Sequence, residues 1–381
     1  MKKNYFIVFL LVATELIGFG LIIPILPQIS HQYTNNGLLL GLLLSSYSLA
    51  QFFAAPILGQ LSDKIGRKPV LLISKFGTIL SYLMLANAAS YSLLLISRLI
   101  DGLSGGNIAV ARAYLTDITA TENRSKAMAI IGIAFGTGFI FGPALGGICY
   151  SISSDFKIAG IVGALFSVIS LVITLIFLKE PKSKEQSEKT LLLKNVNQLS
   201  FSPLLLLTLS LLGMMIFSGF ETSFSIFTES KFNFNTKENS FLFFLIGIAA
   251  FFIQGSFTRI SFKSIKKAMF IAFLCIGLAL IISSLGQTLW VSITPLILLI
   301  FGIAILNTHI PAELSSLSLN KGFIMGIYES INSIARILGP LLFVSMLYNQ
   351  INQMYLILGI FALMTAILSQ LIFLKYKPGK L

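Results

Sequence analysis

The sequence predicts an all-α membrane protein with twelve transmembrane helices in two six-helix repeats, and three observations lead to this fold class. Of the 381 residues, 56% are hydrophobic and 11% are charged, and the mean hydropathy is +0.90. Twelve apolar runs follow one another, and pairs of residues recur at an offset close to 200. A soluble domain carries about 25% charged residues. Because surface-to-volume scaling prevents a soluble fold of this size from burying so much apolar surface, the composition excludes soluble enzymes, disordered scaffolds and secreted disulfide frameworks.

Each apolar run is long enough for a helix that crosses the bilayer, which takes about 20 residues. Alternating β-barrel patterning is absent, so the runs are helices. The first run follows Lys2 and Lys3 but is longer than the apolar core of a signal peptide, so we expect an uncleaved helix. The predicted helices are 5–29, 37–61, 70–88, 92–118, 127–149, 157–178, 203–228, 239–259, 267–286, 290–313, 322–348 and 353–374.

The loops between these helices differ strongly in basic residues. The loops on the side of the two termini carry 20 Lys and Arg residues, and the opposite loops carry 3, namely Lys157, Lys231 and Lys237. The positive-inside rule therefore places both termini in the cytoplasm. The net charge of +13 is a topology signal, and no basic run interleaved with aromatic residues predicts nucleic-acid binding.

The chain repeats itself in two halves. We expect an N-terminal bundle at 1–178, a cytoplasmic linker at 179–200 and a C-terminal bundle at 201–381. Parallel six-helix repeats are a transporter architecture, with the substrate site between the halves near the membrane midplane. Three glycine pairs occur in the same order in both halves: Gly59 and Gly255 (offset 196), Gly142 and Gly339 (offset 197), and Gly102 and Gly302 (offset 200).

The end of helix 37–61 carries a charged motif, Gly59-x-x-x-Asp63-x-x-Gly66-Arg67-Lys68. Gly59 should let this helix approach helix 322–348, and Asp63 should meet the N-terminal end of that helix. Arg67 and Lys68 are expected to anchor the tight loop at lipid headgroups and to pair with Asp117.

Helix 92–118 contains Arg98-x-x-Asp101-Gly102 followed by Gly105-Gly106. Arg98 lies about 9 Å from the external face, and Asp101 lies one turn deeper on the same face, so the two can pair. The alternative is that Arg98 extends to the interface without a partner.

Helix 127–149 contains closely spaced small residues around a proline. Small residues every four positions permit close helix contact, and proline kinks a helix. The motif consists of Gly138, Gly142, Pro143, Gly146 and Gly147.

Glu15 stands ten residues after Tyr5, about 15 Å deep and near the midplane. A carboxylate there costs roughly 2.5 kcal/mol or more, which favours its protonated form and suits a proton carrier. Asp101 lies at comparable depth, but the charge of Arg98 should keep Asp101 ionised. Glu15 is therefore our choice for the coupling proton, and the alternative is a permanently neutral, hydrogen-bonded carboxyl.

Two further acids lie in the predicted helices of the second half. Glu221 is a cavity acid or an external gate residue, and the sequence does not decide between them. Glu329, Asn332, Ser333 and Arg336 form one stripe at i, i+3, i+4 and i+7, which should face protein or water. We expect a network between Glu329 and Arg336 rather than substrate contact.

No catalytic chemistry is predicted. The sequence has no Gly-x-x-x-x-Gly-Lys-Ser/Thr loop, so ATP does not drive the protein directly. No zinc-ligand spacing and no Ser/His/Asp order is found, so we expect no enzyme activity, cofactor or metal. His309 should make a structural hydrogen bond, and His31 in an external loop receives no role.

The motifs at 59–70, 98–106 and 138–147 resemble motifs A, B and C of the major facilitator superfamily. The segment from Glu15 to Pro27 and the triplet ending in Glu221 are similar to the drug:proton antiporter branch, which includes tetracycline-efflux and multidrug efflux proteins. Two residues depart from the pattern, since Glu15 stands where those proteins carry Asp and Ala129 where motif C usually begins with Gly.

The resemblance implies the major facilitator fold, alternating access and proton-coupled efflux of a small amphipathic compound. The proton-coupling residues would be Glu15, Asp101 and Glu221, with Arg98 as charge partner. The protein would be a monomer in the bacterial plasma (inner) membrane, with protons, substrate and lipid as partners and no nucleic acid. The alternative is a proton-coupled uptake or export carrier for a siderophore or other metabolite, although motif C favours an exporter.

Overall fold

The computed structural model describes residues 2–22, 37–153, 155–181, 201–234, 236–260, 262, 264–317, 320–339, 341–342 and 351–375. Within these ranges the regular elements are helices, as predicted. They are α1 (Lys2–Ile22), α3 (Gly37–Ile65), α4 (Arg67–Ala86), α5 (Tyr91–Gly105), α6 (Asn107–Asp117), η1 (Thr121–Asn123), α7 (Arg124–Ile152), α8 (Lys157–Phe177), α10 (Phe201–Phe232), α11 (Thr236–Ser256), α12 (Ile265–Leu285), α13 (Leu289–Ile293), α14 (Leu296–Leu317), α15 (Lys321–Gly339) and α17 (Ile351–Lys375).

The helices confirm the predicted fold class. Nine spans among the described residues are long and apolar enough to cross a membrane, and Phe241–Ser256 is a shorter apolar helix. The other predicted runs coincide with α3 and α15. Parts of the predicted helices 5–29 and 322–348 lie outside the described residues.

Two of the predicted helices are interrupted. Helix 92–118 consists of α5 and α6, which meet at Gly106, and the backbone of Ala55 in α3 packs directly against this glycine. Helix 290–313 consists of α13 and α14, with Pro295 between them. Proline lacks the backbone N–H that a continuous helix needs, but it is tolerated at the start of a new one.

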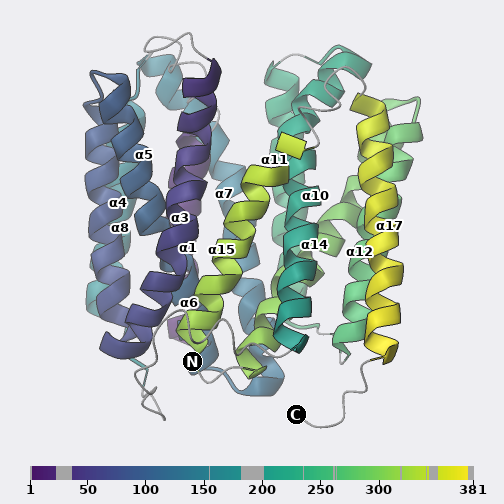
Figure 1. Ribbon diagram of the computed structural model, residues 1–381. Coiled ribbons are helices and arrows are strands. Elements are labelled where there is room, and N and C mark those ends of the chain that lie inside the picture. Colours follow the sequence, from purple (N-terminus) through teal and green to yellow (C-terminus); the bar gives the residue numbers. More distant parts are fainter. Residues whose placement is uncertain are drawn as a thin grey trace.

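The helices α1 to α8 and the helices α10 to α17 occupy opposite sides of the molecule, and α15 leans between them (Figure 1). We call these two sets the N-terminal and C-terminal helices. They meet where α3 packs along α15 and where α7 packs along α11. The first turn of α1 and the last turn of α17 lie at the same end, which we call the terminal end (Figure 1). Most of the predicted linker lies outside the described residues, so the domain boundaries remain predictions.

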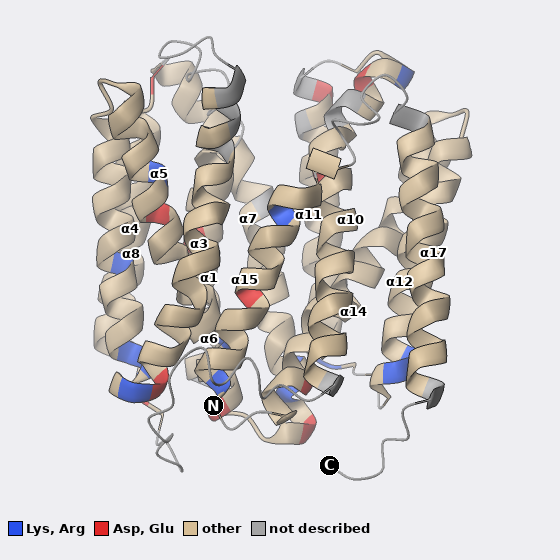
Figure 2. Ribbon diagram, in the orientation of Figure 1, with Lys and Arg blue, Asp and Glu red and all other residues tan. Residues whose placement is uncertain are grey.

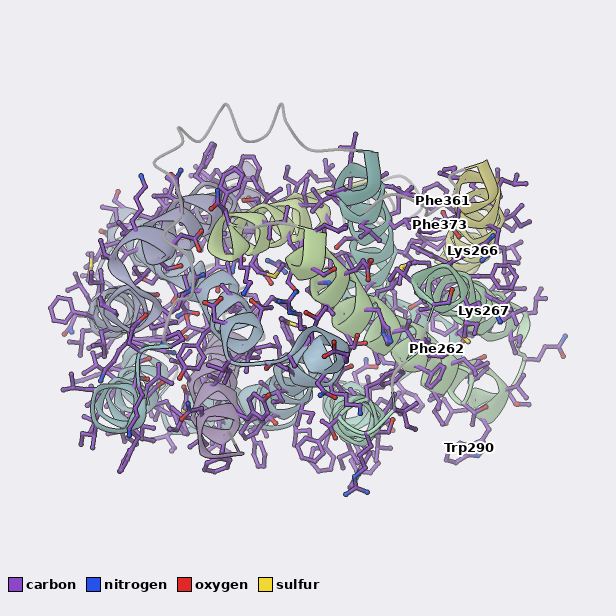
Figure 3. All side chains as sticks on the ribbon, turned by 90° about the horizontal axis from the view of Figure 1, so that it is seen from below. Phe262, Lys266, Lys267, Trp290, Phe361 and Phe373 are labelled. Atoms are coloured by element: carbon purple, nitrogen blue, oxygen red, sulfur yellow. The ribbon has the colours of Figure 1, made fainter. Side chains whose placement is uncertain are left out.

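The outer surface is apolar between two polar ends. Phe76, Phe252 and Trp290 are 65%, 70% and 72% exposed, and Trp290 lies at the periphery when the molecule is viewed from the terminal end (Figure 3). Lys and Arg residues gather at the terminal end (Figure 2). An apolar perimeter of helices with satisfied backbone groups faces lipid, so the chain is a multi-pass membrane protein.

The predicted orientation can be tested with two exposed glutamates at opposite ends of the molecule. Glu122 lies in η1 between α6 and α7, and Glu229 lies in the last turns of α10. In a background with Cys149 and Cys275 replaced by Ala, an impermeant maleimide applied to intact cells should label Glu229→Cys and leave Glu122→Cys unlabelled. Labelling of Glu122→Cys from outside would reverse the orientation.

Candidate functional site

A cavity of about 90 Å³ lies between the N-terminal and C-terminal helices. Helices α10, α11, α14 and α15 form most of its wall, and α6 and α7 close it from the other side. Four charged side chains line this mainly apolar space, namely Arg112, Glu221, Glu329 and Arg336. Apolar walls with a few convergent polar groups are typical of a small-molecule site.

Arg112 and Glu329 form an ion pair across this cavity. Arg112 Nε lies 2.7 Å from Glu329 Oε1, and both side chains are 2% exposed. The guanidinium also lies over the Tyr328 ring, 5.1 Å from its centroid. The pair joins α6 to α15, so it links the two sets of helices inside the membrane.

Arg336 contacts α3 instead of Glu329. Its Nη2 donates to Gln51 Oε1 at 2.6 Å and to Ser333 Oγ at 3.0 Å, and Ser333 Oγ donates to the backbone oxygen of Glu329. The Glu329–Arg336 network predicted from the sequence is therefore wrong in its partners, because each charge is held by a residue of the N-terminal helices. Asn332 accepts a hydrogen bond from Ser210 at 2.7 Å and also lines the cavity.

Glu15 lies within the N-terminal helices, away from the residues that line the cavity. Its Oε2 is 2.5 Å from Lys75 Nζ and accepts from Asn107 Nδ2 at 3.1 Å. Lys75 is fully buried and also donates to the backbone oxygen of Leu11. The carboxyl of Glu15 is thus ion-paired between α1, α4 and α6.

The sequence analysis did not identify Lys75 or Arg112. A signal for both was available, because a basic residue inside an apolar run is costly and is functional by default. Gln51 carries no charge, and nothing in the sequence distinguishes it from other polar residues in the same helix. Four of the 27 Lys and Arg residues stand inside predicted helices and away from their ends: Lys75, Arg98, Arg112 and Arg336.

The predicted pair between Arg98 and Asp101 is confirmed. Arg98 Nη1 lies 2.6 Å from Asp101 Oδ2, and the guanidinium lies 5.2 Å from the centroid of the Tyr47 ring. Arg98 is 3% exposed, which excludes the alternative that it extends to the interface. Neither residue lines the cavity.

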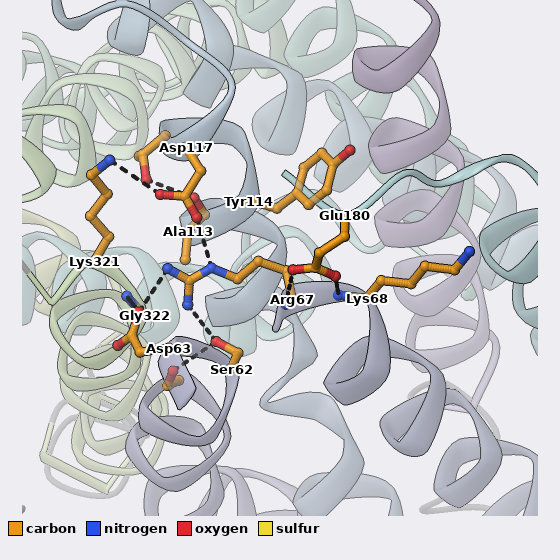
Figure 4. Close-up of polar contacts among 12 residues, drawn as sticks. Ser62, Asp63, Arg67, Lys68, Ala113, Tyr114, Asp117, Glu180, Lys321 and Gly322 are labelled. Atoms are coloured by element: carbon orange, nitrogen blue, oxygen red, sulfur yellow. Dashed lines mark hydrogen bonds and ion pairs between the residues drawn. The ribbon is translucent and has the colours of Figure 1, made fainter. Parts of the chain in front are cut away.

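At the terminal end, Asp63 holds the start of α15 (Figure 4). Its carboxylate accepts from the backbone N–H groups of Gly322 at 3.0 Å and Phe323 at 2.9 Å, as predicted. Arg67 Nη2 lies 2.7 Å from Asp63, and Arg67 Nε lies 2.8 Å from Asp117. A negative charge at a helix N-terminus is stabilised by the helix dipole, so Asp63 joins α3 to α15.

The expected pairing of Lys68 with Asp117 is wrong. Lys68 Nζ donates to the backbone oxygen of Leu175 at 2.8 Å, and the second partner of Asp117 is Lys321, at 3.1 Å (Figure 4). The structure instead brings Glu180 to this loop, where its carboxylate accepts from the backbone N–H groups that begin α4.

Gly66 and Gly59, two glycines of the charged motif from Gly59 to Lys68, have separate roles. Gly66 has φ +101°, which L-residues rarely adopt, and forms the tight turn between α3 and α4. A Cβ on Gly59 would meet the backbone of Gly322 in α15. The predicted approach of these two helices at Gly59 is therefore confirmed.

The glycines of α7 pack against α1, the helix that carries Glu15. A Cβ on Gly138, Gly142 or Gly146 would meet α1 backbone, whereas Gly147 has open space around it. Three of the motif glycines thus permit the close contact that small residues predict, and Pro143 lies inside α7. Close helix packing therefore does not explain why a glycine stands at position 147.

Glu221 lines the cavity, which favours the cavity acid over the external gate residue. Among the described residues its carboxylate has no ion pair. His309 Nε2 accepts from the Phe262 backbone N–H at 3.0 Å, so the predicted structural hydrogen bond is confirmed. His31 lies outside the described residues.

Comparison with known proteins relates this chain to a protein family. The family model of the Major Facilitator Superfamily matches residues 8–340. The chain is 30% identical to the class H tetracycline resistance protein of Pasteurella multocida over 361 residues, covering 90% of this chain and 88% of the relative. It is also 30% identical over 404 residues to major facilitator superfamily domain-containing protein 10 of Mus musculus, covering 89% and 86%.

Solved structures agree with this fold. The human organic anion transporter MFSD10 (TETRAN) superposes with a TM-score of 0.88 at 27% identity, covering 97% of this chain and 99% of that one. The proton:xylose symporter XylE superposes with a TM-score of 0.78 at 14% identity, covering 99% and 96%, and supports the fold alone.

The contact between Asp63 and α15 can be measured without a substrate. Asp63→Asn removes the charge and one acceptor oxygen, and hydrogen bonds to a charged group contribute about 1.5–3 kcal/mol. Amide hydrogen exchange at Gly322 and Phe323 should therefore accelerate about tenfold or more in the purified protein. Glu122→Gln, a charge removal at an exposed site of the same end, is the control and should leave these amides unchanged. Unaltered protection in Asp63→Asn would disprove the contact.

The pair between Glu15 and Lys75 predicts a non-additive effect on stability. Glu15→Gln or Lys75→Met alone leaves one buried charge without its partner, which costs about 3–5 kcal/mol. The double variant Glu15→Gln/Lys75→Met removes both charges and should recover most of this loss, as measured by thermal unfolding in detergent. Additive losses in the double variant would contradict the pair.

Proposed function

Because this chain belongs to the major facilitator superfamily, we propose that it exports a small amphipathic compound in exchange for protons by alternating access. The family makes it a transporter and not an enzyme. The observation that supports proton coupling is the position of α6, an 11-residue helix. At its start, Asn107 donates to Glu15, and five residues later Arg112 pairs with Glu329 at the cavity.

Alternating access is supported by the contacts at the terminal end. Asp63 and the ion pair between Asp117 and Lys321 hold α15 against the N-terminal helices there. Arg124 in α7 also donates to the backbone oxygen of Ser315 in α14 at 2.9 Å. These contacts close the terminal end, and the predicted orientation makes it the cytoplasmic gate.

Proton coupling would act through the charge on Glu15. A proton on this carboxyl removes the partner of Lys75 and changes the hydrogen bond from Asn107. Because Asn107 and Arg112 share one short helix, a change at Glu15 can shift the ion pair that joins the two sets of helices. Each proton that crosses a potential of 100 mV contributes about 2.3 kcal/mol.

The direction of transport is supported by two findings. The tetracycline resistance proteins among the relatives and the motif from Gly138 to Gly147 both favour export. The alternative is a proton-coupled uptake or export carrier for a siderophore or other metabolite. The organic anion transporter among the similar structures shows that this fold at 27% identity also serves substrates other than tetracycline.

Everted membrane vesicles test the proposal. With a panel of labelled cations, anions and zwitterions that includes tetracycline, an acid-inside gradient should drive accumulation of at least one compound, and an uncoupler should abolish it. In Glu15→Gln/Lys75→Met, gradient-driven accumulation should be lost while downhill exchange of the same compound persists, and Glu122→Gln should behave as wild type.

Two outcomes would overturn parts of this proposal. If the double variant still accumulates the compound with unchanged pH dependence, the coupling proton lies elsewhere, with Asp101 and Glu221 as the next candidates. If a gradient that is acid outside drives accumulation inside intact cells, the protein is an uptake carrier.

A further inference from the structure

We infer that the cavity binds an organic anion whose acidic group docks on Arg336 and Arg112, in competition with the carboxylate of Glu221. This inference deepens the proposed function, since it takes the cavity as the substrate site and names the substrate class. It does not depend on the direction of transport or on which residue carries the coupling proton.

The cavity contains unsatisfied hydrogen-bond donors. Among the described residues, Arg112 Nη1, Arg336 Nε and Gln254 Nε2 are buried nitrogen atoms without a hydrogen-bond partner, and all three residues line the cavity. Arg112 is 2% exposed and Gln254 is 5% exposed. A buried donor without an acceptor is costly, so these groups are suited to a ligand that brings acceptor oxygens.

Apart from the carboxylate of Glu221, several acceptors that line or border the cavity already have hydrogen-bond partners. Glu329 Oε1 is paired with Arg112 Nε, and Gln51 Oε1 accepts from Arg336. Asn332 Oδ1 accepts from Ser210. The free guanidinium donors therefore favour a carboxylate or sulfonate, because a guanidinium binds these groups with two parallel, charge-assisted hydrogen bonds.

The remaining wall of the cavity is apolar and suits the body of an amphipathic molecule. Four aromatic rings belong to it, from α7, α10 and α11. A space of about 90 Å³ holds an acidic group and part of a small ring. Pockets for drug-sized ligands are about 300–1,000 Å³, so the cavity must widen to bind a larger molecule. The rings are those of Phe135, Phe217, Phe220 and Phe243.

Glu221 opposes such a ligand. The ionisable side chains at the cavity are Arg112 from α6, Glu221 from α10, and Glu329 and Arg336 from α15, while the lining residues of α7, α11 and α14 contribute none. Arg112 neutralises Glu329, which leaves Glu221 as the like charge that an incoming anion meets near Arg336. Removing the charge of Glu221 should therefore strengthen anion binding.

This competition bears on the coupling proton. A proton on Glu221 would favour the anion, so proton and substrate would load together at that residue, which is the behaviour of a symporter. Exchange of protons for an anion requires a coupling site outside the cavity. Glu15, held by Lys75 and Asn107 within the N-terminal helices, meets that condition.

Binding of four naphthalene probes to the purified full-length protein tests the inference. The probes are 2-naphthoate, 2-naphthalenesulfonate, the neutral methyl ester of 2-naphthoate and 2-naphthylmethylammonium, measured by calorimetry at one pH. The two anions should bind most tightly. Arg336→Gln should weaken them about tenfold or more, and Glu221→Gln should strengthen them about threefold or more, with the ester little changed in both.

Control variants separate the site from general effects. Arg259→Gln and Glu122→Gln change the same charges at exposed positions and should leave all four affinities unchanged. Arg336→Lys keeps the positive charge without the planar donors and should weaken the anions less than Arg336→Gln. Thermal unfolding confirms that each variant is folded before its affinities are compared.

The result is decisive because Arg336→Gln and Glu221→Gln should change the anion affinities in opposite directions. Tighter binding of the ammonium probe that is lost in Glu221→Gln would overturn the inference, as would failure of both anions to bind or anion affinities that do not change in either variant. If the vesicle experiment fails while Arg336→Gln weakens and Glu221→Gln strengthens anion binding, the anion site is supported and proton-coupled export is rejected. If proton-driven export is found but the anion affinities do not change in this way, the proposed function is supported and the anion site is rejected.

Discussion

The ion pair between Arg112 and Glu329 is the buried contact that joins the two sets of helices at the cavity. It lies inside the membrane, and both side chains are 2% exposed. Separating a buried pair without replacement costs about 3–5 kcal/mol, so α6 and α15 can part only if new partners reach the two charges. A ligand acid that binds Arg112 supplies one of those partners. Under the proposed function, occupation of the cavity would therefore favour movement of its walls.

The contacts at the terminal end have a different energetic character. The side chains of Asp117 and Lys321 are 18% and 26% exposed, so water can replace their pairing at little cost. Asp63 has both Arg67 in its own motif and the backbone N–H groups of α15 as partners. When α15 leaves, Arg67 still neutralises Asp63. The proposed gate could therefore open without leaving a charge unpaired, whereas separation of the pair at the cavity would leave two.

The sequence predicted the contacts of residues in recognisable motifs better than the contacts of residues outside them. Asp63 at the start of α15, Arg67 with Asp117 and Arg98 with Asp101 follow from motif spacing or from the resemblance that the motif carries. The partners of Glu15 and Glu329 do not, because Glu329 and Arg112 are 217 residues apart and spacing carries no information on which helices pack together. The basic residues inside apolar runs could have been identified as requiring acidic partners, since an unpaired charge is not tolerated there. Which acid each one takes depends on which helices pack together, and close backbone approaches such as those at Gly59 and Gly142 are visible only in the structure.

Helix α6 contacts both proposed sites, the proton site and the cavity, and coupling between them would obey a thermodynamic constraint. Asn107 bonds to the proton-binding candidate Glu15, and Arg112 bonds to the wall of the cavity. If a proton on Glu15 changes the affinity of the cavity for its ligand by some factor, the ligand must change the proton affinity of Glu15 by the same factor. A ligand on Arg112 would release Glu329 and alter the position of α6, and through Asn107 it would alter the stability of the charged form of Glu15. The sign of this coupling decides between antiport and symport: the proton and the ligand exchange if each weakens the binding of the other, and move together if each strengthens it.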